Sequence, residues 1–391
     1  MTTYTSYIGS GTTLLATSAD YATVNLWFDA SGGETYSSGD EVQAIFQSSA
    51  DGHSGVHSFS DDQRGWDPDV DMTITFSSTN LTAVGPWEYG YLEVDGTYKI
   101  ESTQAAKTFN FNNLDMEFTG YQNIEVNVEN TDGDGGNHMT INVNNCRVIA
   151  AADSTNANRI FEVGSDSANL VGIHTLNFTN SIFAPKRRLV TQNPSNGSQS
   201  SNIIVNAVGC SFFSGINSFF NPNRSSDSNF ELHLSGCIAH SFVGSISDYN
   251  GVVQAEQAGY TSGTATDYIT NEPDEVVDNW TTETGGTKTN VSADATFVYG
   301  AAPAAGEIAF SGPTLASYPF ASVDMDLRLW DSTNNAASGF VSNVTLPSPD
   351  LAGHDRGLTP FDAGPYEISF SSGGSTDTRP TFKIVQVNMY N

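Results

Sequence analysis

The sequence predicts an all-β solenoid, a fold in which short strands stack as successive coils. A block of about nine residues recurs six times, the copies lie 27 to 35 residues apart, and each copy alternates apolar and polar side chains. Repeats with a period of this size are typical of stacked architectures in which each unit contacts only its neighbours. The six copies are anchored at Thr79, Leu114, Cys146, Ser181, Cys210 and Cys237.

Three columns of the repeat are wholly apolar, at five and three residues before the anchor and two residues after it. The position between the first two columns is polar or histidine, a period-two pattern that is typical of a strand with one buried face. The inward columns are Ile74, Phe109, Ile141, Leu176, Val205 and Leu232; Phe76, Phe111, Val143, Phe178, Ala207 and Leu234; and Leu81, Met116, Val148, Phe183, Phe212 and Ala239. The outward column is Thr75, Asn110, Asn142, Asn177, Asn206 and His233.

The residue just before each anchor is predicted to form a bend between two strands. Asn and Gly dominate this column, and they enter the left-handed backbone region at the lowest cost. Stacked coils place equivalent residues about 4.8 Å apart, so buried Asn side chains in such a column can bond from one coil to the next. About 30 residues per coil leave room for three strands and three turns. The bend residues are Ser78, Asn113, Asn145, Asn180, Gly209 and Gly236.

The repeat resembles the right-handed parallel β-helix of pectate-lyase-like proteins, in which coils of this length wind three parallel sheets around an apolar core. The resemblance covers roughly residues 40 to 370. A second stretch is similar to the closing segment of many extracellular β-helix proteins, because it keeps DLAGHDRG and DAGPYE but lacks that segment's Asn-Pro pair. This likeness implies a terminal coil and cap. It rests on Asn290, Ala293, Asp294, Phe297, Val298, Asp326, Arg328, Leu329, Asp350, Leu351, Gly353, Arg356, Asp362, Gly364, Tyr366 and Glu367.

The ends of the chain are predicted to differ from the coils. Residues 1–40 contain one expected helix, Ser18 to Ala30, with Asp20 as N-cap and Gly32 as the stop signal. Its apolar stripe, Val24, Trp27 and Phe28, suits a lid on the first coil or, alternatively, a docking helix for a partner.

One elongated β-helix domain is expected over residues 41–370, with its first strand at Glu41 to Gln47. Between residues 260 and 303 the pattern loosens, and we expect short strands there that the sequence does not place. Residues 371–391 form a predicted strand tail that either pairs with a neighbouring subunit or folds back on its own sheet.

The composition of the chain limits the classes of partner that it can bind. The chain has 14 Lys and Arg against 44 Asp and Glu, a formal charge of −30, which argues against nucleic acid and anionic membranes. No segment has the apolar length of a membrane span, and residues 1–9 have neither the basic start nor the apolar core of a signal peptide. The three cysteines occupy the anchor column. Free buried thiols are favoured there over a disulfide between Cys210 and Cys237.

Three groups of residues are candidates for binding. Asn130, Asp132 and Asp134 have the spacing of the first ligands of an EF-hand loop, although Ile141 replaces its last acid, so Ca²⁺ is the one cofactor considered. The alternative is a solvated turn.

A second group is Trp66, Asp67, Asp69 and Asp71, which an extended backbone would present to a cation or a sugar unless they form a solvated face. The third, Asp51, His53 and His57, has metal-compatible spacing, but its Gly and Ser residues suggest a loop.

No catalytic set is recognised. The outward positions of the aligned strands lack stacked carboxylates, and Arg147, Lys186, Arg187 and Arg188 follow the strands without an acid at a matching place. The resemblance and the missing signal peptide favour a non-enzymatic protein on the surface of a virus particle, in particular a bacteriophage. Such a capsid decoration, head spike or tail-associated fibre would be made in the host cytoplasm.

The expected partners are other virion proteins such as the major capsid protein, further copies in a homo-trimer, and host surface polysaccharide. Two alternative functions stay open: a polysaccharide lyase or glycosidase of the tailspike type, and a bacterial surface adhesin.

Overall fold

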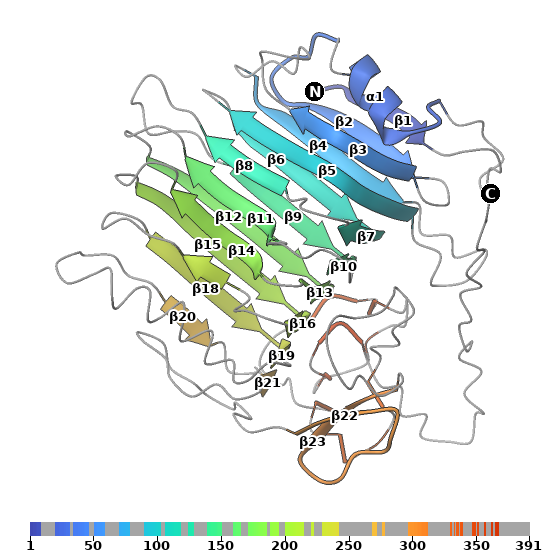
Figure 1. Cartoon of the computed structure of the whole chain (residues 1–391), viewed down its shortest axis with the longest axis vertical. Helices are drawn as coiled ribbons and strands as arrows, with labels where there is room; N and C mark the ends of the chain where they lie inside the picture. Colours follow the sequence, from blue (N-terminus) through green and yellow to red (C-terminus); the bar gives the residue numbers. More distant parts are fainter. Residues whose placement is uncertain are drawn as a thin grey trace.

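The residues that the structure describes are mostly β-structure with one helix in the computed structural model (Figure 1). The parts that the structure describes are residues 1–8, 20–31, 34–46, 51–58, 70–78, 90–102, 106–118, 124–128, 139–150, 159–165, 171–185, 188–194, 200–214, 220–222, 229–241, 268–271, 276–277, 296–311, 329–330, 332, 334–335, 337–338, 346–348, 350–351, 356, 361–362 and 364–366.

The first sheet has nine strands, and every pairing in it is parallel. Its strands follow one another in space in the same order as in the sequence, as a solenoid requires. They are β1 (Thr3–Ile8), β2 (Asp40–Phe46), β4 (Met72–Ser78), β6 (Lys107–Asn112), β9 (Met139–Asn144), β12 (Val171–Thr179), β15 (Ser200–Val208), β18 (Asn229–Ser235) and β20 (Tyr268–Asn271).

The second sheet has twelve strands and two wings that share the long strand β5 (Gly90–Ser102). The first half of β5 pairs with one wing and the second half with the other. One wing is β7 (Leu114–Phe118), β10 (Arg147–Ala150), β13 (Ile182–Ala184), β16 (Ser211–Ser214), β19 (Ile238–Ser241) and β21 (Val276–Val277). The other wing is β8 (Ile124–Val128), β11 (Arg159–Ser165), β14 (Arg188–Pro194) and β17 (Phe220–Pro222), and β3 (Asp51–Ser58) pairs with β5.

Strand order along the chain follows a regular cycle. From β6 to β17, a strand of the nine-stranded sheet is followed by one strand of each wing, and the next strand returns beside the first. Three strands per repeat is the number that the repeat length predicts. Separately, β22 (Thr296–Tyr299) and β23 (Glu307–Phe310) form a two-stranded parallel sheet near the end of the stack opposite to β1 (Figure 1).

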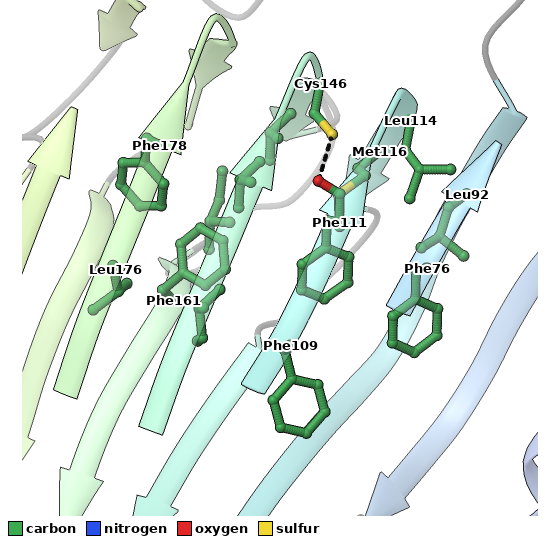
Figure 2. Packing of buried hydrophobic residues seen from close by; sticks show 14 of the residues in the cluster. Phe76, Leu92, Phe109, Phe111, Leu114, Met116, Cys146, Phe161, Leu176 and Phe178 are labelled. Carbon is green, nitrogen blue, oxygen red and sulfur yellow. Dashed lines mark hydrogen bonds between the residues drawn. The ribbon is translucent and has the colours of Figure 1, made fainter. Parts of the chain in front are cut away.

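The predicted stacking of side chains is confirmed. Phe111 pairs with Val143, and Val143 pairs with Phe178, so these inward residues lie on successive strands of the nine-stranded sheet. All three are buried, and Figure 2 shows Phe111 and Phe178 on the same side of the sheet. The Phe76 and Phe111 rings stack with centroids 5.1 Å apart and an interplanar angle of 7°. A column chosen from sequence periodicity is therefore a continuous apolar stack.

The predicted bends are also confirmed, with one exception. Asn113, Asn145 and Asn180 have φ angles of 57°, 53° and 50°, and the two glycines of the column have φ angles of 60° and 59°. The ladder is present, because Asn145 Nδ2 donates to Asn113 Oδ1 at 3.3 Å and Asn180 Nδ2 donates to Asn145 Oδ1 at 2.8 Å. Ser78 instead ends β4 without a left-handed φ, and its hydroxyl donates to the Asn113 carbonyl.

The amino-terminal prediction needs correction. Helix α1 is Val24–Ser31, and its N-cap is Thr23, whose Oγ1 accepts from Leu26 N at 3.3 Å. Asp20 instead accepts from Tyr7 N at 2.8 Å, because the chain here runs beside β1. The first strand is thus β1, which precedes the helix.

The predicted apolar stripe of α1 is nevertheless buried. Val24, Trp27 and Phe28 are all fully buried in the helix. Trp27 and Phe28 lie 5.4 Å and 6.2 Å from the Phe76 ring, centroid to centroid, so the helix covers the core at this end of the stack. This contact supports the lid interpretation of the helix.

The three cysteines are free and buried, as expected. Cys146 Sγ donates to the Phe111 carbonyl of the preceding strand at 3.3 Å, the contact drawn in Figure 2. Burial raises the pKa of the Cys146 thiol to about 12, and burial next to Cys237 raises the pKa of Cys210. These thiols therefore pack as small apolar residues and not as nucleophiles.

The loosely patterned region contains short strands, as predicted: β20 and β21 extend both sheets by one more step. The strand tail at residues 371–391 lies outside the described residues. Parts of the segment that resembles a closing cap pack along the column of bends, since Gly364 N donates to Gly236 O at 2.8 Å and Arg356 Nη2 donates to Asn180 Oδ1 at 3.1 Å. The segment therefore braces the flank of the stack.

Candidate binding face

Five neighbouring strands of the nine-stranded sheet, β4, β6, β9, β12 and β15, form a regular grid of uncharged side chains on their outward side. Outward positions are every second residue along a strand, and the register of the paired strands aligns these positions in columns. The residues of this grid are half-buried, except for the buried Thr75, so the grid lies at the surface. We call it the Thr/Asn face: Thr73, Thr75, Ser77, Thr108, Asn110, Asn112, Thr140, Asn142, Asn144, Thr175, Asn177, Thr179, Ile204, Asn206 and Val208.

The central column of this face is joined by side-chain hydrogen bonds. Asn206 Nδ2 donates to Asn177 Oδ1 at 2.9 Å, Asn177 Nδ2 to Asn142 Oδ1 at 2.8 Å, and Asn142 Nδ2 to Asn110 Oδ1 at 2.8 Å. Asn110 Nδ2 then donates to Thr75 Oγ1 at 3.1 Å. This outward ladder fixes the amides of Asn110, Asn142 and Asn177 in one orientation, because each of them is hydrogen-bonded to both neighbours.

The ladder ends on a carboxylate near the amino-terminal edge of the sheet. Thr75 Oγ1 donates to Glu41 Oε1 at 2.9 Å, and Gln43 Nε2 donates to the same oxygen at 2.9 Å. In a neighbouring column, Asn144 Nδ2 donates to Asn112 Oδ1 at 2.9 Å. Hydrogen bonds between amides of successive strands therefore recur across the face and are not confined to a single column.

An ion pair on the second sheet corrects the sequence analysis. Arg147 of β10 pairs in register with Asp115 of β7, and its guanidinium donates to both carboxylate oxygens. An acid does therefore sit at a matching place for this arginine. Asp115 falls one residue after the anchor, outside the apolar columns that periodicity identifies. Both side chains are more than four-fifths buried, which suits a structural brace.

One inward column contains ionisable side chains. Asp40, Lys107 and His174 occupy this column, separated by two methionines, and all three are buried. Lys107 Nζ donates to the Val70 carbonyl. Backbone N–H groups of Ser37 and Thr2 hold the pKa of Asp40 below its usual value, donating to its carboxylate at 2.9 Å and 2.7 Å. Lys107 and Asp40 therefore hold the segments that precede β4, β1 and β2 against the sheet.

The binding groups suggested by the sequence are only partly described. Asn130, Asp132 and Asp134 lie outside the described residues, as do Trp66, Asp67 and Asp69. Asp71 is exposed, and its Oδ1 accepts from Ala106 N at 2.9 Å. One of its oxygens is thus already engaged by the backbone of the next repeat.

The loop predicted for the two histidines is wrong. Asp51, His53 and His57 belong to strand β3, which pairs with β5, and not to a loop. Within the described residues, no three His, Cys, Asp or Glu side chains gather as a metal site. The described part of the chain also contains no helix with the length and apolar character to cross a membrane.

Comparisons with known proteins add no assignment. No known protein family, curated protein or solved structure matches this chain significantly.

Proposed function

We propose that this protein is a right-handed parallel β-helix that serves as a non-enzymatic surface protein of a virus particle, as a capsid decoration, head spike or tail-associated fibre. The parallel sheets and the three-strand cycle support the β-helix. Right-handed winding follows from the strong preference for right-handed crossovers between parallel strands. In this role the protein stabilises the particle, contacts the host surface, or does both.

The observation that carries the proposal is the outward ladder from Asn206 to Glu41. It joins the central column of this face by bonds between successive strands, so these side chains rigidify the stack. A rod that is braced inside by aromatic stacks and outside by amides suits a protein that must persist outside a cell. The net charge of −30 supports solubility at high local copy number on a particle.

Protein content of purified particles is the direct test. Mass spectrometry of virions purified from the virus that encodes the chain should detect it at a fixed ratio to the major capsid protein. Antibody labelling in electron micrographs should then place it on the head or the tail. Absence of the chain from purified particles would exclude the proposal. Sedimentation of the purified chain tests the proposed homo-trimer separately.

The Arg147–Asp115 pair favours a second candidate, a polysaccharide lyase or glycosidase. An arginine next to a carboxylate is a combination that such enzymes use, although this pair is largely buried. Incubation with neutral and acidic polysaccharides, followed by assays for new reducing ends and unsaturated products, decides between the two. Product formation that Arg147→Met abolishes would favour the enzyme.

A further inference from the structure

We propose that the Thr/Asn face binds an uncharged polysaccharide that runs across the strands, along the stack. The inference gives the host-contact role of the proposed function a ligand class and rests on that role only for its biological meaning. The site itself is argued from charge, area and hydrogen-bonding capacity.

The net charge of the chain and the uncharged face argue against anionic partners. The chain carries a net charge of −30, yet none of the fifteen positions of the face is ionisable. Glu41 and Glu231 mark its two ends, because they pair with Thr73 and Ile204 in the same outward column. An anionic polymer would be repelled by the whole molecule and would find no lysine or arginine on the face. An uncharged ligand fits this surface best.

Area argues against a protein partner. Five strands spaced about 4.8 Å apart, with three outward positions about 6.7 Å apart on each, cover on the order of 500 Å². A stable protein interface needs roughly 800 Å² on each partner. A face of this size and regularity suits a narrow polymer with a short repeat, and the strand spacing is close to the length of one sugar residue in an extended chain.

Chemistry of the face matches sugar rings. Each ladder asparagine uses one of its two N–H donors and part of its carbonyl capacity on neighbouring strands, so further capacity is directed to the surface. Threonine methyl groups, Ile204 and Val208 supply apolar contacts beside these amides. A sugar ring presents hydroxyls at its edge and C–H groups on its faces. Because the ladder already fixes the amides, binding costs little side-chain entropy.

Affinity gel electrophoresis of the purified full chain tests the proposal with four probes: dextran, mannan, xylan and the anionic polygalacturonate. At least one neutral polysaccharide should retard the protein, and polygalacturonate should not. A double variant, Thr140→Glu with Thr175→Glu, should raise the dissociation constant at least tenfold because it places charge in the grid. Thr3→Glu, at an exposed position on the edge strand, is the matched control and should bind normally.

Thermal unfolding verifies that the variants fold, and Thr140→Lys with Thr175→Lys replaces the glutamate pair if that pair does not. The proposal is overturned if no neutral probe retards the chain, if polygalacturonate retards it equally, or if binding survives both double variants. Sedimentation identifies the remaining occupant: an oligomer that the double variant dissociates would make the face a subunit interface. Particle mass spectrometry remains independent, so failure of this inference is distinguishable from failure of the proposed function.

Discussion

The two large sheets use the outward sides of their strands differently. On β9 and β12 of the nine-stranded sheet, the outward residues are half-buried Thr and Asn. On β13 and β16 of the second sheet, the outward residues Ile182, Ala184, Ser211 and Phe213 are buried. The cover over this second face includes β23, whose Phe310 ring lies 5.4 Å from the Phe213 ring, and Gly364 beside Ser211. One repeat thus yields an open polar face and a closed apolar one.

This difference shows what the outward positions of a repeat indicate about the structure. Apart from the column that contains Asp40, Lys107 and His174, the inward residues named above are apolar in both sheets, because each repeat contributes to one buried core. Outward residues report whether something covers the sheet, because a strand buried on both sides has apolar residues in succession and not in alternation. The short runs IFA at 182–184 and SFF at 211–213 are of this kind.

The largest effect is expected for removal of an outward side chain under the cover. Phe213→Ala should lower the free energy of unfolding by about 3–5 kcal/mol, because Phe213 is fully buried against Phe310. Val208→Ala, at a half-buried outward position on the open face, should cost about 1 kcal/mol or less. Chemical denaturation measures both. Equal costs would show that the two faces are not different.

A smaller effect is expected where the cover touches the stack. Gly364 has a φ of +86°, and a Cβ there would lie 2.8 Å from Ser211 Oγ and 3.0 Å from Ile238 Cδ1. Gly364→Ala should therefore destabilise the protein by about 2–4 kcal/mol through backbone strain and overlap. Gly39→Ala is the matched control, since it has a φ of +85° and nothing within 4 Å of its Cβ. If both variants lose the same stability, strain alone acts.

On the open face, a single ladder residue should matter less. Asn142→Ala removes one bond to Asn110 and one from Asn177, and should cost about 1–2 kcal/mol. A double-mutant cycle with Asn177→Ala should show coupling, because the two side chains share a bond. Strict additivity in the denaturation data would contradict the ladder.

The smallest effect concerns pH. The pKa of Asp40 is lowered in the folded state, chiefly by the Ser37 and Thr2 backbone N–H groups. The ionised form therefore stabilises the fold above the unfolded-state pKa of about 4, and this contribution is lost as pH falls through the lower folded value. Asp40→Asn should reduce the loss of stability between pH 6 and pH 2. An unchanged pH profile in denaturation experiments would mean that Asp40 does not contribute.

Much of the fold follows from the sequence because a period-two pattern repeated in register fixes both the strands and their partners. The pairing of Phe109 with Ile141 and the left-handed Asn145 are both predicted from single columns. The resemblance predicts a terminal coil and cap for the segment that contains Gly364, but not its place against Ser211, because that contact joins distant segments that share no pattern. The outward asparagines of the Thr/Asn face were placed correctly, but their mutual bonds depend on side-chain orientation, which periodicity does not determine.

The outward ladder is also directional. Every asparagine in it gives its N–H to the neighbour nearer the amino terminus, and the row finishes on the carboxylate of Glu41. The amide dipoles consequently add along the row instead of cancelling, so its two ends are not equivalent. Sugar chains are likewise directional, with a reducing and a non-reducing terminus. A polymer bound along this row would accordingly prefer one of its two orientations. The face would therefore distinguish the reducing end of the polymer from the non-reducing end.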